Sequence, residues 1–237
     1  MHDQSPDFLS FAAQVLADAF PTREVEAGAY AGMRYPRLLP LMRFAVRQYR
    51  AEGFGHLMVM RTRAMGLMEL TTASFMPDDG GRVPYLLVDM MAMRGKHTVF
   101  VEFYDCTADG AEPQTLDAMA ARFAALPDYA ERPAWYVGER MPCSLIKGGT
   151  AKDAPALQAM ARAATEAYLA LAARAPRGAE NLAGLRTFRE RMLREGNPSS
   201  ATMRRVLGAA GAERFFCEMV MPLPEDDAAA NEGTNEA

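Results

Sequence analysis

Four apolar segments follow one another in the first half of the chain, separated by short glycine-rich or charged breaks. Each carries hydrophobic residues on both sides of an alternating, strand-like pattern. The short breaks favour strands that run antiparallel in a meander, because parallel strands need long crossover connections. The segments predicted as strands are residues 56–63, 66–76, 83–93 and 97–106.

Outside this region the apolar residues recur at helical spacing. In the first such segment, one stripe holds Phe8, Phe11, Ala12, Val15 and Leu16, and Pro21 ends the pattern. Residues 38–53 are predicted to form a second helix because they are rich in Leu, Met, Phe and Arg. Gly53 and Gly55 are predicted to end it. The sequence predicts helices over residues 8–20, 38–53, 113–126, 153–174, 179–195 and 201–207, and short strands over 141–146 and 215–223.

A sheet that is apolar on both faces needs helices on both sides. The predicted fold class is therefore α/β, a three-layer α/β/α sandwich with a central antiparallel sheet. No linker or internal repeat divides the chain, so residues 1–223 are predicted to form a single domain. Residues 224–237 are acidic and rich in Asn, Gly and Ala, which predicts a disordered tail.

Cysteine usage and the absence of targeting signals favour a cytoplasmic protein. The three cysteines, Cys106, Cys143 and Cys217, are odd in number and widely spaced, which argues against a disulfide framework and a structural zinc site. The start of the chain lacks a signal-peptide pattern, and no apolar run reaches the ~20 residues of a membrane span. We therefore expect no membrane partner.

The net charge of −4 comes from the C-terminal tail, which carries five acidic residues. Without them the 30 acidic residues fall to 25, against 26 basic ones, so the body is near neutral and nucleic acid is not an expected partner. Basic residues nevertheless cluster in two regions. The first region contains Arg34, Arg37, Arg43, Arg47 and Arg50, and the second contains Arg186, Arg189, Arg191, Arg194, Arg204 and Arg205. These side chains either form a solvated surface or bind an anionic ligand or an acidic protein.

Asp89 is the one charge inside the apolar strand 83–93. Alternation places its side chain on the same face as those of Tyr85, Leu87 and Met91. Burial disfavours the charged carboxylate, so a carboxyl in this position tends to have a raised pKa, which suits a proton donor near neutral pH. The alternative is a structural aspartate hydrogen-bonded to a nearby loop.

Thr72 is the predicted polar neighbour of Asp89. If Met76 pairs with Val83 across the intervening loop, Leu70 lies opposite Asp89 and Leu87 lies opposite Thr72. Thr72 and Asp89 are then diagonal neighbours on one face. A hydroxyl and a carboxyl would share an otherwise apolar surface.

Common catalytic signatures are missing. The chain has no glycine-rich dinucleotide or phosphate-binding motif and no serine-hydrolase nucleophile motif. Its three histidines have no neighbours at metal-ligand spacing, so no metal site is predicted.

Three stretches, residues 84–89, 135–147 and 204–225, together resemble the ferredoxin-dependent bilin reductase family. The first ends at Asp89, in the manner of the family's extended strand that leads to a catalytic aspartate. In the second, Trp135, Cys143 and Lys147 fall where the family has tryptophan, cysteine and a propionate-binding arginine. The resemblance spans roughly residues 55–225 and implies the same α/β/α fold.

The resemblance also implies a function. A linear tetrapyrrole such as biliverdin would lie between the sheet and the C-terminal helices, and no bound metal or flavin cofactor is used. Single electrons would come from reduced ferredoxin, or from flavodoxin, with haem oxygenase as an enzyme of the same pathway. Asp89 would protonate the bilin and Lys147 would hold a propionate, while Cys143, Tyr85, Leu87 and Met91 would line the substrate site.

Two positions depart from the family pattern. Thr72 stands where members have histidine or asparagine, and Asn197 stands where they have a second aspartate. Neither side chain can supply a proton in a cycle, so a two-electron reduction fits better than a four-electron one. The alternatives are a non-catalytic protein that binds a bilin or haem, an enzyme like the red chlorophyll catabolite reductases, and a plain structural or interaction domain.

Overall fold

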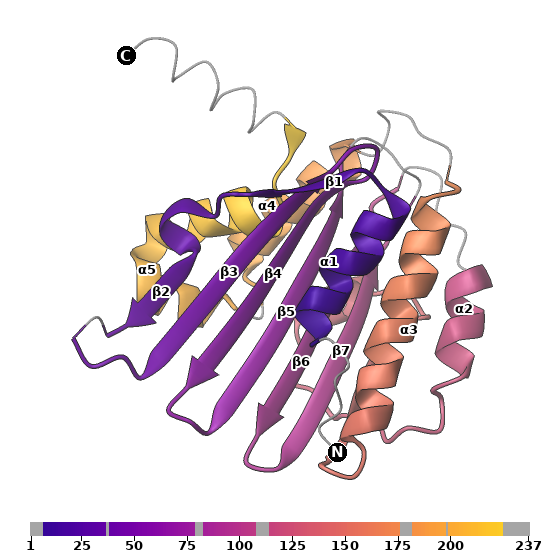
Figure 1. Ribbon diagram of the computed structural model, residues 1–237, viewed down its shortest axis with the longest axis horizontal. Helices are drawn as coiled ribbons and strands as arrows, with labels where there is room; N and C mark the ends of the chain where they lie inside the picture. The colour runs from indigo at the N-terminus through magenta and orange to yellow at the C-terminus, as the bar shows by residue number, and fades with distance from the viewer. Residues whose placement is uncertain are drawn as a thin grey trace.

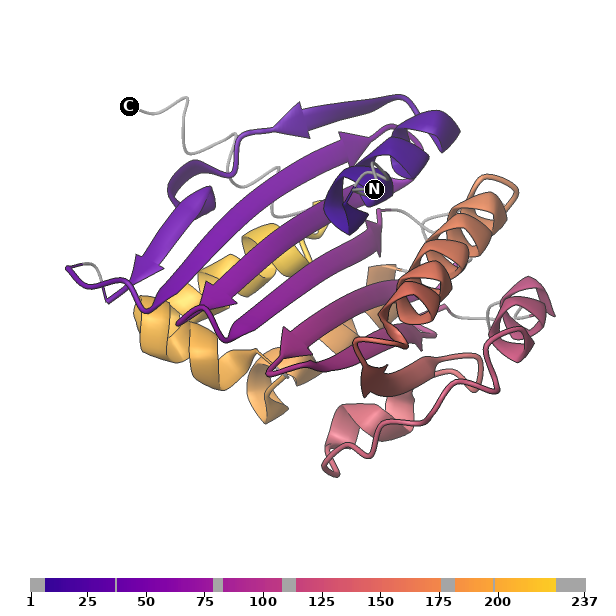
Figure 2. The ribbon, with the colours of Figure 1, turned by 60° about the horizontal axis from the view of Figure 1, so that its bottom comes forward.

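A single antiparallel sheet forms the centre of the molecule, with helices packed on both faces (Figures 1 and 2). The computed structural model describes residues 7–36, 38–78, 83–107, 114–175, 182–197 and 199–224. Within these ranges the sheet has eight strands in the order β1-β3-β4-β5-β6-β7-β8, and β2 pairs with the other end of β3. The predicted α/β/α sandwich with an antiparallel sheet is confirmed.

The meander predicted for the first half of the chain forms strands β4 to β7. Each strand pairs antiparallel with the next. Tight turns at Gly66 and Gly95 connect β4 to β5 and β6 to β7. The strand predicted near residue 141 begins later, at Leu145. The strands are β1 (Thr22–Val25), β2 (Gly32–Tyr35), β3 (Met42–Ala51), β4 (Gly55–Ala64), β5 (Met68–Pro77), β6 (Tyr85–Met93), β7 (Lys96–Tyr104) and β8 (Leu145–Thr150).

The helices divide between the two faces of the sheet. On one face lie α1 (Phe8–Ala19) and α3 (Ala154–Ala172), with α2 (Gln114–Ala121) against α3. On the other lie α4 (Leu182–Glu195) and α5 (Ser200–Phe215), and α5 continues into a π-helical turn, η4 (Phe216–Val220). Two short 3-10 helices, η1 (Gly28–Tyr30) and η2 (Trp135–Glu139), complete the described elements.

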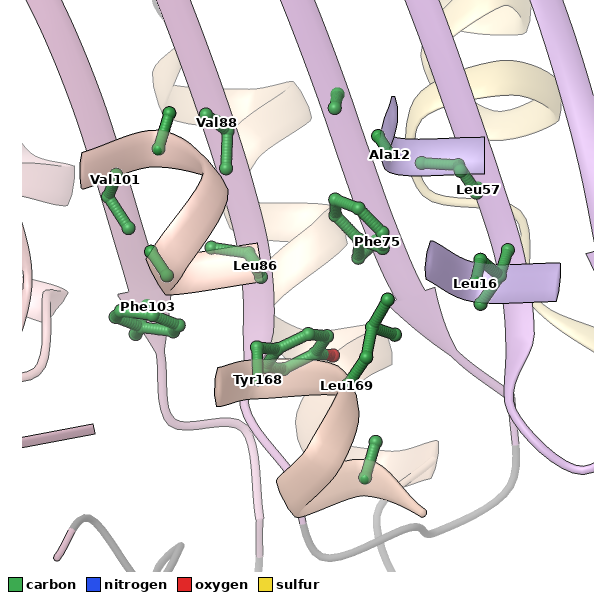
Figure 3. Close-up of a cluster of buried hydrophobic side chains, with 14 of the residues drawn as sticks. Ala12, Leu16, Leu57, Phe75, Leu86, Val88, Val101, Phe103, Tyr168 and Leu169 are labelled. Atoms are coloured by element: carbon green, nitrogen blue, oxygen red, sulfur yellow. The ribbon is translucent and has the colours of Figure 1, made fainter. Parts of the chain in front are cut away.

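The larger core lies between the sheet and helices α1 and α3 (Figure 3). Phe75, Leu86 and Phe103 project from three neighbouring strands onto Tyr168 of α3, and all four side chains are buried. The Tyr168 hydroxyl donates a hydrogen bond to the carbonyl of Pro84 (2.8 Å), at the entry to β6. This contact holds the start of β6, the strand that carries Asp89.

Two predicted elements were wrong. Residues 38–53 contain strand β3 rather than a helix, because Phe44, Val46 and Gln48 are buried in alternation with exposed Arg43 and Arg47. The segment 215–223, predicted as a strand, continues α5 as η4. The predicted disordered tail lies outside the described residues beyond position 224. In the described part of the chain, no helix has both the length and the apolar character to cross a membrane.

Candidate functional site

A cavity of about 500 Å³ lies between the sheet and the C-terminal helices. Its floor is formed by side chains of β4, β5 and β6, and its roof by α4, α5 and η4. Most of the lining is apolar, with methionines from both sides: Met58 and Met60 from the floor, and Met192, Met203 and Met221 from the roof. An apolar cleft with few polar groups is the usual form of a small-molecule site.

Asp89 and Thr72 form the polar centre of the cavity floor. They lie directly opposite each other on β6 and β5, and the Thr72 hydroxyl donates a hydrogen bond of 2.5 Å to Asp89 Oδ1. The predicted diagonal arrangement was wrong by a shift of two residues. Because such a shift keeps every side chain on its face, the predicted sharing of one surface by the two residues holds.

Burial raises the pKa of Asp89 to about 7. The hydrogen bond from Thr72 opposes this rise, and the negative charge of Glu102 on the adjacent strand β7 adds to it. The side chain is still partly accessible to the cavity. Asp89 can therefore hold a proton near neutral pH and face a ligand at the same time.

The raised pKa of Asp89 predicts that the protein loses stability as the pH rises. An unfolded aspartate ionises near pH 4, whereas folded Asp89 keeps its proton to about pH 7, so stability falls between these values. Asp89→Asn has no ionisable group at this position, so it should not show this loss of stability with rising pH. We expect the variant to gain up to about 4 kcal/mol over the wild type at pH 8 and almost nothing at pH 4, as measured by urea denaturation. An equal difference at both pH values would contradict the assigned pKa.

A second hydrogen-bonded group ties the roof of the cavity to its floor. The Ser74 hydroxyl donates to the carbonyl of Val220 in η4 (2.7 Å), and its oxygen lies 2.9 Å from the Tyr85 hydroxyl. Burial raises the pKa of Tyr85, so the phenol stays neutral. Tyr85 is thereby oriented along the floor, two residues before Leu87 and four before Asp89.

A buried ion pair supports the floor next to Asp89. Glu102 lies opposite Leu87 and is fully buried. It accepts hydrogen bonds from the Tyr104 hydroxyl (2.9 Å) and from Arg140 Nε (2.7 Å), and Arg140 also pairs with Glu131. Burial raises the pKa of Glu102, and the positive charge of the Arg140 guanidinium opposes this rise and stabilises the carboxylate.

The structure brings together most of the site residues predicted from sequence. Tyr85, Leu87 and Asn197 line the same cavity as Asp89 and Thr72. Met91 shares their face of β6 but lies outside the lining. The parts that these residues would play in binding and catalysis stay predictions.

The assignment of Lys147 and Cys143 to this site is corrected. Lys147 pairs with Val99, whose side chain packs in the core under α3, so both lie on the opposite face of the sheet from Asp89. Its ammonium donates to Asp128 Oδ1 (2.6 Å) and to the carbonyl of Ala124 (3.2 Å). Cys143 is buried in the same core, and burial raises the pKa of its thiol to about 11. Neither residue can reach a ligand in the cavity.

Two arginines, rather than Lys147, supply positive charge to the cavity. The sequence indicated them only as members of a basic region. Arg194 near the end of α4 and Arg204 in the first half of α5 are exposed, which places them at its mouth. Two carboxylates, Glu190 and Glu213, line it from the same helices. Among the described residues, no group of three or more His, Cys, Asp or Glu side chains is arranged to hold a metal ion.

Comparison with known proteins supports the architecture. No family model and no curated protein matches the chain. Among solved structures, phytochromobilin synthase from tomato in complex with biliverdin matches with a TM-score of 0.76. The two proteins share a fold. The alignment covers 90% of this chain and 80% of the tomato protein, at 9% sequence identity, so the likeness is one of architecture.

Proposed function

We propose that this protein binds a linear tetrapyrrole of the biliverdin type and reduces it with electrons from ferredoxin or flavodoxin. The observation that carries the proposal is Asp89, a carboxyl with a pKa of about 7 on the floor of an apolar cavity of about 500 Å³. The shared fold with a protein solved in complex with biliverdin supports the choice of ligand.

The cavity suits the chemistry of a bilin. A bilin is a largely apolar chain of four pyrrole-derived rings with two propionate groups. Methionine side chains adapt to such an irregular ligand, and Met58, Met60 and Met203 supply them on both sides. Arg194 and Arg204 at the mouth can pair with the propionates as planar guanidinium forks, the role first expected of Lys147.

Asp89 would act as the proton donor in this reduction. The Thr72 hydroxyl occupies Oδ1, which leaves Oδ2 as the oxygen to carry the proton toward the ligand. Protonating the ring system makes it a better electron acceptor, and the hydrogen bond from Thr72 stabilises the carboxylate left behind. Each two-electron reduction takes up two protons, so Asp89 must be reprotonated by solvent that enters at the cavity mouth.

The first test is a titration of the protein with biliverdin, followed by absorbance. We expect saturable binding, with a dissociation constant that rises about tenfold or more when Arg194 and Arg204 are both replaced by Met, because two charged hydrogen-bond donors are lost. Arg205→Met is the matched control, since Arg205 adjoins Arg204 but does not line the cavity. If biliverdin does not bind, the proposal fails, whether or not haem binds.

A second candidate function is binding without turnover. Thr72 and Asn197 favour it, because neither side chain can donate a proton in a catalytic cycle. An anaerobic assay with biliverdin, ferredoxin and a ferredoxin-reducing system separates the two functions. Loss of the biliverdin absorbance band supports the reductase, whereas a stable complex under conditions in which a known reductase turns over supports the binding protein.

A further inference from the structure

Three hairpin turns lie side by side at one end of the sheet (Figures 1 and 2). In sequence they are far from the residues that form the cavity roof. They connect β2 to β3, β4 to β5, and β6 to β7. The strand register aligns them, since Ala64 lies opposite both Met42 and Met68, and Met68 lies opposite Met93. We call this row the hairpin edge and define it as residues 38–41, 65–67 and 93–96.

The hairpin edge holds most of the exposed large apolar side chains. Seven such residues occur in the described part of the chain, and six of them belong to this edge. Single exposed apolar residues are ordinary, but six in one row mark an interaction surface. The six are Leu38, Leu39, Leu41, Met65, Leu67 and Met93, with Leu38 fully exposed and Leu39 and Met65 exposed by 72% and 64%.

A ladder of arginines runs directly behind these apolar tips. Arg43 lies opposite Arg34 on one side and opposite Arg63 on the other, and all three are exposed. Like charges directly opposite each other destabilise a sheet. Glu69, which pairs with Arg63, is the acidic residue that continues this row. The arrangement is unfavourable for folding alone and suits an anionic partner.

The turn residues themselves are unusual choices. Met65 and Arg94 have positive φ angles of 53° and 51°, and each is followed by a glycine. Asparagine and aspartate are favoured at this position of a tight hairpin turn, while long side chains are disfavoured there. The chain keeps an apolar and a cationic side chain at the tips of two adjacent turns, although neither choice helps the turn to form.

We propose that the hairpin edge docks on the surface of a membrane that contains anionic phospholipids. The apolar tips would enter the interface between headgroups and acyl chains, and the arginine ladder with Arg94 and Lys96 would contact lipid phosphates. An open hollow of about 360 Å³ between the β4–β5 and β6–β7 turns is lined by Arg94 and by the ion pair of Arg63 with Glu69. Arg94 is the cation in it that can contact a phosphate headgroup. This binding needs no spanning helix, and it revises the expectation of no membrane partner.

A membrane fits these observations better than a protein partner does. The apolar side chains sit on separate turns in a row, so a flat and deformable interface can receive all of them at once. Cations directly next to exposed apolar residues are the pattern of side chains that lie at the headgroup level. The proposal is independent of the proposed function, because the hairpin edge and the cavity lining share no residue.

Co-sedimentation of the full chain with lipid vesicles tests this inference. We expect binding to vesicles of phosphatidylcholine mixed with phosphatidylglycerol, little binding to phosphatidylcholine alone, and weaker binding at high salt. The variant M65N/R94N should bind roughly tenfold more weakly, because it loses one inserted apolar group and one cation. Asparagine fits the turn geometry, so the fold should be retained, and unchanged circular dichroism and thermal unfolding would verify this.

Arg205→Gln is the control, since it removes an exposed cation from α5 and should leave vesicle binding unchanged. The inference is overturned if the wild type does not sediment with anionic vesicles, or if M65N/R94N sediments as the wild type does. It is also overturned if the wild type forms a dimer without lipid and M65N/R94N abolishes that dimer, because the edge would then bind a second copy of the chain.

Discussion

Replacing Asp89 with asparagine is expected to lower bilin turnover by about 10²- to 10⁴-fold, the usual contribution of a positioned general acid. Asparagine has nearly the same shape, and its carbonyl can still accept the hydrogen bond from Thr72. Binding of biliverdin should therefore change little, while the proton needed for reduction is no longer supplied. Single-turnover reduction under anaerobic conditions measures this loss separately from binding.

The pH dependence of the same reaction gives an independent readout. In the wild type the rate should be high below pH 7 and fall above it, because Asp89 with a pKa of about 7 loses its proton there. In Asp89→Asn this inflection should disappear. Asp117→Asn, on the exposed side of α2, is the control and should retain both the rate and its pH profile. Full turnover by Asp89→Asn would exclude Asp89 as the donor.

The pairing of Thr72 with Asp89 shows what sequence patterns can predict. Alternation in β5 and β6 has a period of two, so the face of each side chain follows from the strand assignment alone. The partner across the hairpin depends on how many residues the turn consumes, which alternation does not reveal. The face was therefore predicted correctly and the opposing residue was not.

The misplacement of Lys147 has a related cause. Its face is determined by pairing with Val99 on β7, forty-eight positions away in sequence, and no local pattern specifies that pairing. The arginines at the cavity mouth depend in the same way on how α4 and α5 pack over the sheet. In β3, by contrast, the local sequence carries two conflicting patterns. Phe44 and Val46 alternate with arginines as in a strand, whereas the Leu, Met, Phe and Arg composition of residues 38–53 favours a helix.

Replacing Arg140 with methionine is expected to destabilise the protein by about 3 to 5 kcal/mol, because it leaves the buried carboxylate of Glu102 without its counter-charge. The two side chains of this pair are only 7% and 2% exposed. The Tyr104 hydroxyl would remain as a hydrogen-bond donor to Glu102, but it carries no charge. Urea denaturation at neutral pH measures the loss.

Burial of the pair, rather than the number of hydrogen bonds, should determine this cost. Arg47 forms an equally regular fork to Glu24, with distances of 2.7 and 2.6 Å, but both side chains are about half exposed. Arg47→Met should therefore cost no more than about 1 kcal/mol. Adding Glu102→Gln to Arg140→Met should recover much of the lost stability, and the loss in Arg140→Met should shrink at low pH, where Glu102 takes up a proton. Equal costs for the Arg140 and Arg47 variants would show that the floor beside Asp89 does not depend on a buried charge pair.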